Sequence, residues 1–115
     1  MSAPELPFAE EFRDLAARVE SGPFEPWDFK ECARLLFISY SHFRKLFSEH
    51  VGQSPHDYLL SMRMRRAAHW LATSSKSIKE ISYQCNYDDL AQFSKAFKQK
   101  IGLSPRQFRN SLRLG

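Results

Sequence analysis

The stretch FRKLFSEHVGQSPHDY, at residues 43–58, recurs 50 residues later as FSKAFKQKIGLSPRQF, at residues 93–108. Six positions carry the same residue type in both copies: two Phe four residues apart, a Lys midway between them, and then Gly, Ser and Pro. Chance seldom keeps such a set in phase. A motif that occurs twice in so short a chain indicates two similar structural units that act together.

The length and composition of the chain favour an all-helical protein. With 115 residues it forms one domain or two very small lobes. A chain of this size buries about two-thirds of the surface that its unfolded form exposes, so it can fold without disulfides or metals. Glycine is scarce, with four residues, and few runs alternate apolar and polar side chains as strands do. The predicted fold class is therefore all-α.

Helix start and stop signals divide the first half of the chain. Apolar residues at three- and four-residue steps predict an amphipathic helix over about residues 8–20. Asp28, followed by Glu31, is typical of a capping box and predicts the start of a second helix. Ser39 predicts the N-cap of a third helix, which ends where Gly52 can take a left-handed conformation.

The second half repeats this plan after a long connecting helix. Ser54 as N-cap and Pro55 at the first helical position predict a helix over about residues 55–73. Asn86 can take the positive φ of the second tight turn. The remaining helix starts are expected at Ser77, at Asp88 or Asp89, and at Ser104. Two short helices joined by a tight turn make a helix-turn-helix, so we expect two such lobes, with about seven helices in all.

The predicted organisation has four parts. They are an N-terminal segment with the first helix (1–27), a first helix-turn-helix (28–54), a linker helix (55–73), and a second helix-turn-helix with the last helix (74–115).

One side of the second helix in each lobe is predicted to face outward. In a helix-turn-helix this side is left to enter a DNA major groove. It holds Tyr40, Ser41, Arg44, Lys45 and Ser48 in the first copy, and Leu90, Ala91, Ser94, Lys95 and Lys98 in the second. Arg and Lys suit the O6 and N7 acceptors of guanine, and Ala or Leu can touch a thymine methyl. Each Gly-x-Ser-Pro turn adds a helix start, where backbone N–H groups stabilise an anion such as phosphate.

The charge is unevenly placed along the chain. Residues 1–61 hold 6 Lys/Arg and 10 Asp/Glu, whereas residues 62–115 hold 11 Lys/Arg and 3 Asp/Glu, which together give the net charge of +4. A basic half of this kind indicates a polyanionic partner.

The sequence argues against an enzyme and against a metal site or cofactor. Cys32 and Cys85 fit no zinc or redox spacing, and their helical patterns predict two buried, reduced thiols. The four histidines form no pair at metal-ligand spacing on one helix face: His42, His50, His56 and His69. No nucleophile has a base beside it. The alternative to DNA binding is a helical protein-interaction module without base readout, with the acidic first helix as its surface.

The stretch from about Asp28 to Arg109 resembles the DNA-binding domain of the AraC/XylS transcription regulators. The densest similarity lies in SIKEIS at 77–82, NYD at 86–88, FSKAFK at 93–98 and IGLSPRQFR at 101–109. The residues Tyr58-Leu59, Arg63, Ala67 and Leu71 also match the linker helix of that family. Phe37 stands where the family commonly has Gly, and we expect backbone strain there because a bulky residue at positive φ is unfavourable. Asn86-Tyr87 stands where Gly-Phe is usual.

The resemblance implies that the two recognition helices enter successive major grooves of one DNA face, over a site of roughly 20 base pairs. The base-reading residues that it implies are Ser41, Arg44 and Lys45 in the first lobe, and Leu90, Ala91, Ser94 and Lys95 in the second. The phosphate contacts that it implies are Ser39, Ser54, Ser104 and Lys98.

The resemblance also implies a bacterial transcription regulator, with RNA polymerase as a second candidate partner. Most family members carry a separate ligand-sensing or dimerisation domain, for which this chain has no room. No effector ligand is therefore expected here, and the chain is either a stand-alone regulator or a domain of a longer protein. Since it shows neither a signal peptide nor an apolar run of membrane-spanning length, we expect a cytoplasmic protein at the nucleoid.

Overall fold

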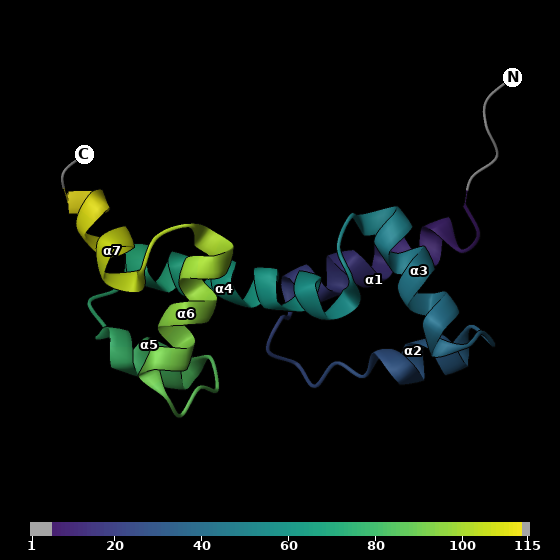
Figure 1. Cartoon of the computed structure of the whole chain (residues 1–115), viewed down its shortest axis with the longest axis horizontal. Helices are drawn as coiled ribbons and strands as arrows, with labels where there is room; N and C mark the ends of the chain where they lie inside the picture. Colours follow the sequence, from purple (N-terminus) through teal and green to yellow (C-terminus); the bar gives the residue numbers. More distant parts are fainter. Residues whose placement is uncertain (1–5, 114–115) are drawn as a thin grey trace, which may run out of the picture. The chain divides into compact units, whose positions relative to one another are not determined.

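The computed structural model describes residues 6–113, which form seven α-helices and no strand (Figure 1). The helices are α1 (Ala9–Ser21), α2 (Phe29–Leu35), α3 (Tyr40–Val51), α4 (Pro55–Thr73), α5 (Ile78–Gln84), α6 (Leu90–Ile101) and α7 (Pro105–Arg113). They belong to two compact units, of which the first ends at Leu59 and the second begins at Leu60. The all-α prediction is confirmed. None of these helices is apolar over the length that a bilayer crossing requires.

Side-chain caps confirm the predicted helix starts. Four serine hydroxyls each accept the amide N–H three residues further on, at 3.0–3.2 Å: those of Ser39, Ser54, Ser77 and Ser104. The Asp28 carboxylate accepts from the Glu31 amide at 3.1 Å, but the Glu31 carboxylate pairs with Arg34 instead of returning to the cap. Asp89, not Asp88, caps α6, because its carboxylate accepts the N–H of Ala91 at 2.8 Å. Local capping chemistry therefore sets where these helices begin.

Phenylalanine rings from three helices form the core of the first unit. Phe12 of α1, with Phe43 and Phe47 of α3, is completely buried, and Phe29 of α2 is nearly so. The ring centroids of Phe12 and Phe43 lie 5.3 Å apart, and those of Phe29 and Phe47 lie 6.1 Å apart. Tyr58 of α4 packs edge-on against Phe47 at 5.8 Å, and its hydroxyl donates to a backbone carbonyl of α1 at 3.0 Å. The start of α4 is thereby joined to the first unit.

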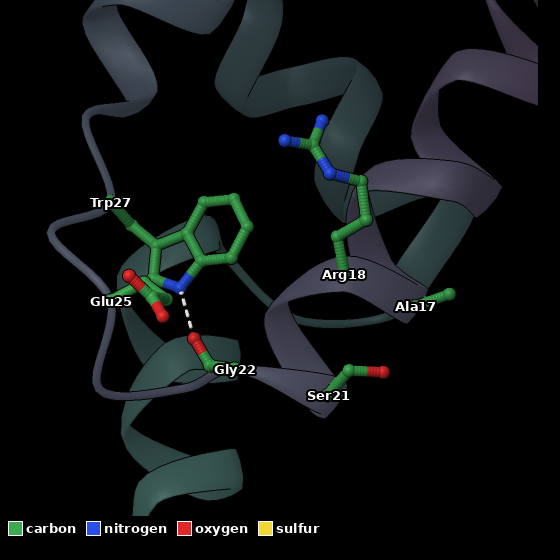
Figure 2. A pocket seen from close by; sticks show the side chains of 6 residues that line it. All are labelled: Ala17, Arg18, Ser21, Gly22, Glu25 and Trp27. Carbon is green, nitrogen blue, oxygen red and sulfur yellow. Dashed lines mark hydrogen bonds between the residues drawn. The ribbon is translucent and has the colours of Figure 1, made fainter.

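An indole ring orders the segment between α1 and α2. The Nε1–H of Trp27 donates to the carbonyl of Gly22 at 2.7 Å, and the Arg18 guanidinium lies over the same ring, 5.7 Å from its centroid (Figure 2). Cation–aromatic contacts of this kind at exposed sites contribute about 0.5–1 kcal/mol. The segment is thus fastened to the end of α1 immediately before the cap of α2.

The tight turn has the same geometry in both units. Phe37 in the first and Asn86 in the second have φ values of 58° and 65°. The next amide N–H donates to a carbonyl five residues back, at 3.2 Å in the first turn and 3.1 Å in the second. That carbonyl belongs to a small buried residue in both cases, Ala33 and Ser82. The second loop holds one residue more, so α2 and α5 start 49 residues apart whereas α3 and α6 start 50 apart.

The second unit is built around a similar pair of rings. Phe93 and Phe97 of α6 are fully buried, and Phe108 of α7 packs edge-on against Phe97 at 5.7 Å. Met64 of α4 is also fully buried, and Met62, two residues before it, is 7% exposed. Both are buried, because α4 is covered on more than one side: two residues of an α-helix turn through about 200°.

An arginine fastens the last helix to the end of α4. The Nε–H of Arg109 donates to the carbonyl of Leu71 at 3.2 Å, and an Nη2–H donates to the carbonyl of Ser74 at 3.3 Å. The last carbonyls of a helix have no intrahelical partner, and a cation beside them is favourable. Arg109 therefore acts as a C-terminal cap for α4.

The two cysteines differ in their exposure. Cys85 is buried, as predicted, and burial raises the pKa of its thiol to about 12. Cys32 is only half-buried, so the prediction of a buried thiol is wrong for this residue. It lines an open groove with Leu15, Leu35 and Leu36. Partial burial still raises the pKa of the Cys32 thiol.

The strained turn of the first unit generates a reciprocal prediction. The side chain of Phe37 is 95% exposed, so it loses no packing when replaced, while a left-handed backbone costs most L-residues about 1–2 kcal/mol. We expect Phe37→Asn to stabilise the protein by about 1 kcal/mol and Asn86→Phe to destabilise it by a similar amount, measured by urea unfolding. No gain in stability from Phe37→Asn, or no loss from Asn86→Phe, would show that the residue at positive φ does not determine the backbone strain of the turn.

The difference between the thiols predicts selective alkylation. At pH 8 both raised pKa values keep the thiols protonated, but only Cys32 is within reach of a reagent. Iodoacetamide is expected to modify Cys32 slowly in the native protein and Cys85 only in urea, as followed by mass spectrometry. Cys32→Ser should abolish the native reaction. Native alkylation of that variant would contradict the burial of Cys85.

Candidate nucleic-acid interface

The burial of α3 leaves one of its sides to solvent. Phe43 and Phe47 are fully buried and face the core of the first unit. The exposed residues of α3 include all three that were predicted to read bases in this unit: Ser41, Arg44 and Lys45. Residues three and four apart on a helix are surface neighbours, so the structure brings these three side chains onto one exposed face.

The helix α6 has the same arrangement with different chemistry. Phe93 and Phe97 are fully buried. Of the predicted base-reading residues, three are exposed and Ser94 is half-buried: Leu90, Ala91 and Lys95 are the exposed ones. Leu90 is 42% exposed. This face therefore offers two apolar contacts, one hydroxyl and one ammonium group.

The four predicted phosphate-contacting residues all lie at the surface. Ser39 and Lys98 are exposed, and Ser54 and Ser104 are half-buried. Each serine is an N-cap, of α3, α4 and α7 respectively, and its oxygen already accepts an amide N–H. A hydroxyl that accepts in this way keeps its own O–H, which can donate to a phosphate oxygen.

The two Gly-x-Ser-Pro turns present fewer backbone donors than an ordinary helix start. Pro55 and Pro105, the first residues of α4 and α7, have no N–H, and the Ser cap takes the N–H two residues after each proline. Among the first three residues of α4 and of α7, only the residue directly after the proline has a backbone N–H that the serine cap does not use. In the second turn the cap is reciprocal, because Gln107 Oε1 accepts the N–H of Ser104 at 3.0 Å.

Positive charge is concentrated on the last two helices. Residues 90–113, which include α6 and α7, carry six Lys or Arg and no Asp or Glu. The first turns of α3 and α6 hold no acidic residue. Within residues 6–113 no three His, Cys, Asp or Glu side chains gather as they would around a metal ion. The exposed helix faces therefore suit an anionic surface.

Sequence reasoning gave no role to Lys30, which the structure brings to the start of α3. Its ammonium lies 5.9 Å from the ring centroid of Tyr40. The two residues belong to different helices, so no helical period relates them. Ser82 was also missed: it is buried in α5, and its hydroxyl lies 3.4 Å from the carbonyl of Tyr87 in the second turn. Its equivalence to Ala33, another small residue, was the available signal.

Comparison with known proteins identifies the family. Residues 32–111 match the family model of a helix-turn-helix domain. The chain is 35% identical, over 92 residues, to an HTH-type transcriptional regulator of Haemophilus influenzae, covering 80% of this chain and 31% of the relative. The chain spans less than a third of the length of this and other curated relatives.

Solved structures agree with this assignment. A Chromobacterium violaceum transcriptional regulator with an AraC-type DNA-binding domain has a TM-score of 0.75 at 26% identity, and the match covers 90% of this chain and 94% of that one. The DNA-binding domain of AdpA, solved in complex with a target DNA, has the same TM-score at 23% identity, covering 90% of this chain and 93% of that one, and shows the common fold.

These findings do not favour an interaction module without base readout, since the matched family consists of DNA-binding regulators. The chain belongs to the AraC/XylS family of transcription regulators, and residues 32–111 are its helix-turn-helix DNA-binding domain.

Proposed function

We propose that this chain binds a specific site of about 20 base pairs on double-stranded DNA, with α3 and α6 in two successive major grooves. The observation that supports the proposal is that α3 has one buried side and one exposed side. Its phenylalanines are fully buried, while Ser41, Arg44 and Lys45 are exposed together on the other side. A helix that is held on one side and polar on the other can enter a major groove without unfolding.

In the first unit, Arg44 and Lys45 donate to the O6 and N7 of guanine, and Ser41 donates to or accepts from a neighbouring base edge. Arg is the more selective of the two cations, because its planar guanidinium donates two parallel hydrogen bonds to guanine. Arg44 therefore carries the largest share of base discrimination in this unit.

In the second unit, Leu90 and Ala91 contact thymine methyl groups, while Ser94 and Lys95 form the polar contacts. The exposed Leu90 supports this role, since contact with a methyl group removes apolar surface from water. The two units thus read different half-sites, the first by charged hydrogen bonds and the second largely by shape and methyl contacts.

Phosphate contacts position the protein and add affinity without specificity. Ser39, Ser54 and Ser104 donate their hydroxyls to phosphate oxygens, and Lys98 adds a charged contact. The organisation that supports this binding is the N-terminal segment (1–27), two helix-turn-helix parts (28–54 and 74–115) and a linker helix (55–73).

The biological role that follows is regulation of transcription by a DNA-bound protein in the nucleoid, with no catalytic step of its own. RNA polymerase is the second partner that we propose for this chain. The family assignment supports this role.

A selected DNA site tests the proposal. Duplexes enriched on this protein from a random pool are labelled, and their affinity is compared with that of a scrambled duplex by fluorescence anisotropy at 50 and 200 mM salt. Each lysine or arginine that neutralises a phosphate, as Lys98 is proposed to do, should lower affinity by about 3.5-fold between these concentrations. Equal affinity for both duplexes, with no dependence on salt, would sink the proposal.

Two substitutions should separate base contacts from phosphate contacts. Arg44→Ala is expected to relax the choice at one or two base pairs, at a cost of about 1–3 kcal/mol for the selected site. Ser54→Asp keeps an N-cap oxygen but adds negative charge beside a phosphate, so it should weaken every duplex by the same factor at unchanged melting temperature.

The matched control is Ser77→Asp, which places the same charge at the cap of α5. Its counterpart in the first unit is already an aspartate, Asp28. We expect a smaller loss of affinity than for Ser54→Asp. The assignment of base contacts and phosphate contacts would be wrong if Ser54→Asp changed only the preference for particular base pairs. It would also be wrong if Arg44→Ala lowered the affinity for all duplexes by the same factor.

A further inference from the structure

Tyr40, the first residue of α3, lies between two cations and the core. Its ring stacks on that of Phe43 with 6.2 Å between centroids and 19° between planes. The Arg44 guanidinium carbon lies 5.8 Å from the centroid of the Tyr40 ring, and the Lys30 ammonium lies 5.9 Å from it. Tyr40 is half-buried and Phe43 is completely buried, so the ring stands on a rigid support.

This arrangement is specific to the first unit and is not a requirement of the fold. The position equivalent to Tyr40 is Leu90, and the position equivalent to Arg44 is Ser94. The lysine equivalent to Lys30 is Lys79, and it lies 5.9 Å from the centroid of Tyr83 on its own helix instead. Since α6 forms a complete helix with the same buried phenylalanines, neither the ring nor its cations are needed to build the helix-turn-helix.

We infer that Tyr40 is a positioning residue for base readout by Arg44, an inference that rests on the proposed function. An exposed arginine side chain has several rotatable bonds, and it loses conformational freedom when it binds a base edge. A guanidinium that lies over an aromatic face is restricted before binding, and its N–H donors stay in its own plane, where a guanine can accept them. The ring of Tyr40 thus lowers the entropy that Arg44 loses on contact with guanine.

The competing role for Tyr40 is to hold Lys30 near the DNA backbone. This ammonium contributes charge rather than directional hydrogen bonds, so its effect on affinity would be the same for every sequence. A substitution of Tyr40 therefore distinguishes the two roles. It lowers discrimination between base pairs if Tyr40 positions Arg44, and it lowers affinity for all sequences equally if Tyr40 holds Lys30.

A double-mutant cycle tests the inference. Affinities of the wild type, Tyr40→Leu, Arg44→Ala and the double variant are measured for the selected duplex and for its single-base-pair changes. Tyr40→Leu installs the residue that the second unit has at this position. At the base pairs that Arg44→Ala relaxes, we expect Tyr40→Leu to lower discrimination about two- to fivefold, the range for an exposed cation–aromatic contact. It should have no further effect in the Arg44→Ala background.

Two further variants separate positioning from a structural role. Tyr40→Phe keeps the aromatic face and should retain wild-type discrimination. Tyr40→Leu in a Lys30→Ala background should still lower discrimination at the same base pairs. The positioning role of Tyr40 would be overturned if the effects of Tyr40→Leu and Arg44→Ala were additive, or if Tyr40→Leu lowered affinity equally for all duplexes. Neither result would contradict the proposed base reading by Arg44. If Arg44→Ala relaxed no base pair, base reading by Arg44 would fail as well.

Discussion

Two phenylalanines, four residues apart on one side of each recognition helix, determine how that helix can be used. Phe43 with Phe47, and Phe93 with Phe97, are completely buried, so neither α3 nor α6 can rotate about its own axis without exposing a ring. Burial of one such side chain contributes about 1.5–3 kcal/mol, which is a large fraction of the stability of a small unit. The buried phenylalanines therefore determine which residues of each helix face solvent.

The tight turn applies a second constraint, on the backbone. In both units one residue of the turn has a positive φ. The amide N–H of the residue after it donates to the carbonyl of a small buried residue five positions earlier in the chain. Asn86 adopts this conformation readily, whereas Phe37 adopts it with its side chain 95% exposed. Because the side chain projects into solvent, it meets no steric obstacle, and the cost is confined to backbone strain. The fold thus tolerates a residue that the local conformation disfavours.

The two units share the residues that build the helix-turn-helix frame and differ in the side chains that face outward. The frame residues are Phe, Gly and the Ser-Pro cap, and the structure gives them the same roles in both units. The outward residues differ: the first unit offers a guanidinium supported by an aromatic ring, and the second offers an apolar pair followed by lysines. Under the proposed function, this difference means that the two units read unequal halves of a DNA site.

Much of the fold could be predicted from the sequence, because helix starts depend on interactions within three or four residues. The caps at Ser39, Ser54, Ser77 and Ser104 needed no tertiary information, and the predicted span of α4 matched the observed helix. The outward positions of the predicted base-reading residues, of which only Ser94 is half-buried, followed from the helical period and the two phenylalanines. That Asp89 rather than Asp88 caps α6 required the geometry of the loop.

The sequence by itself determined the element order, the caps, the two similar units and the outward face of each recognition helix. Only the tertiary structure decided which side chains from separate elements lie together. Lys30 beside Tyr40, Arg109 on the carbonyls at the end of α4, the burial of Met64 and the partial exposure of Cys32 all belong to this group. The physical reason is that helical period and capping act over a few neighbouring residues, whereas these contacts depend on how whole helices pack.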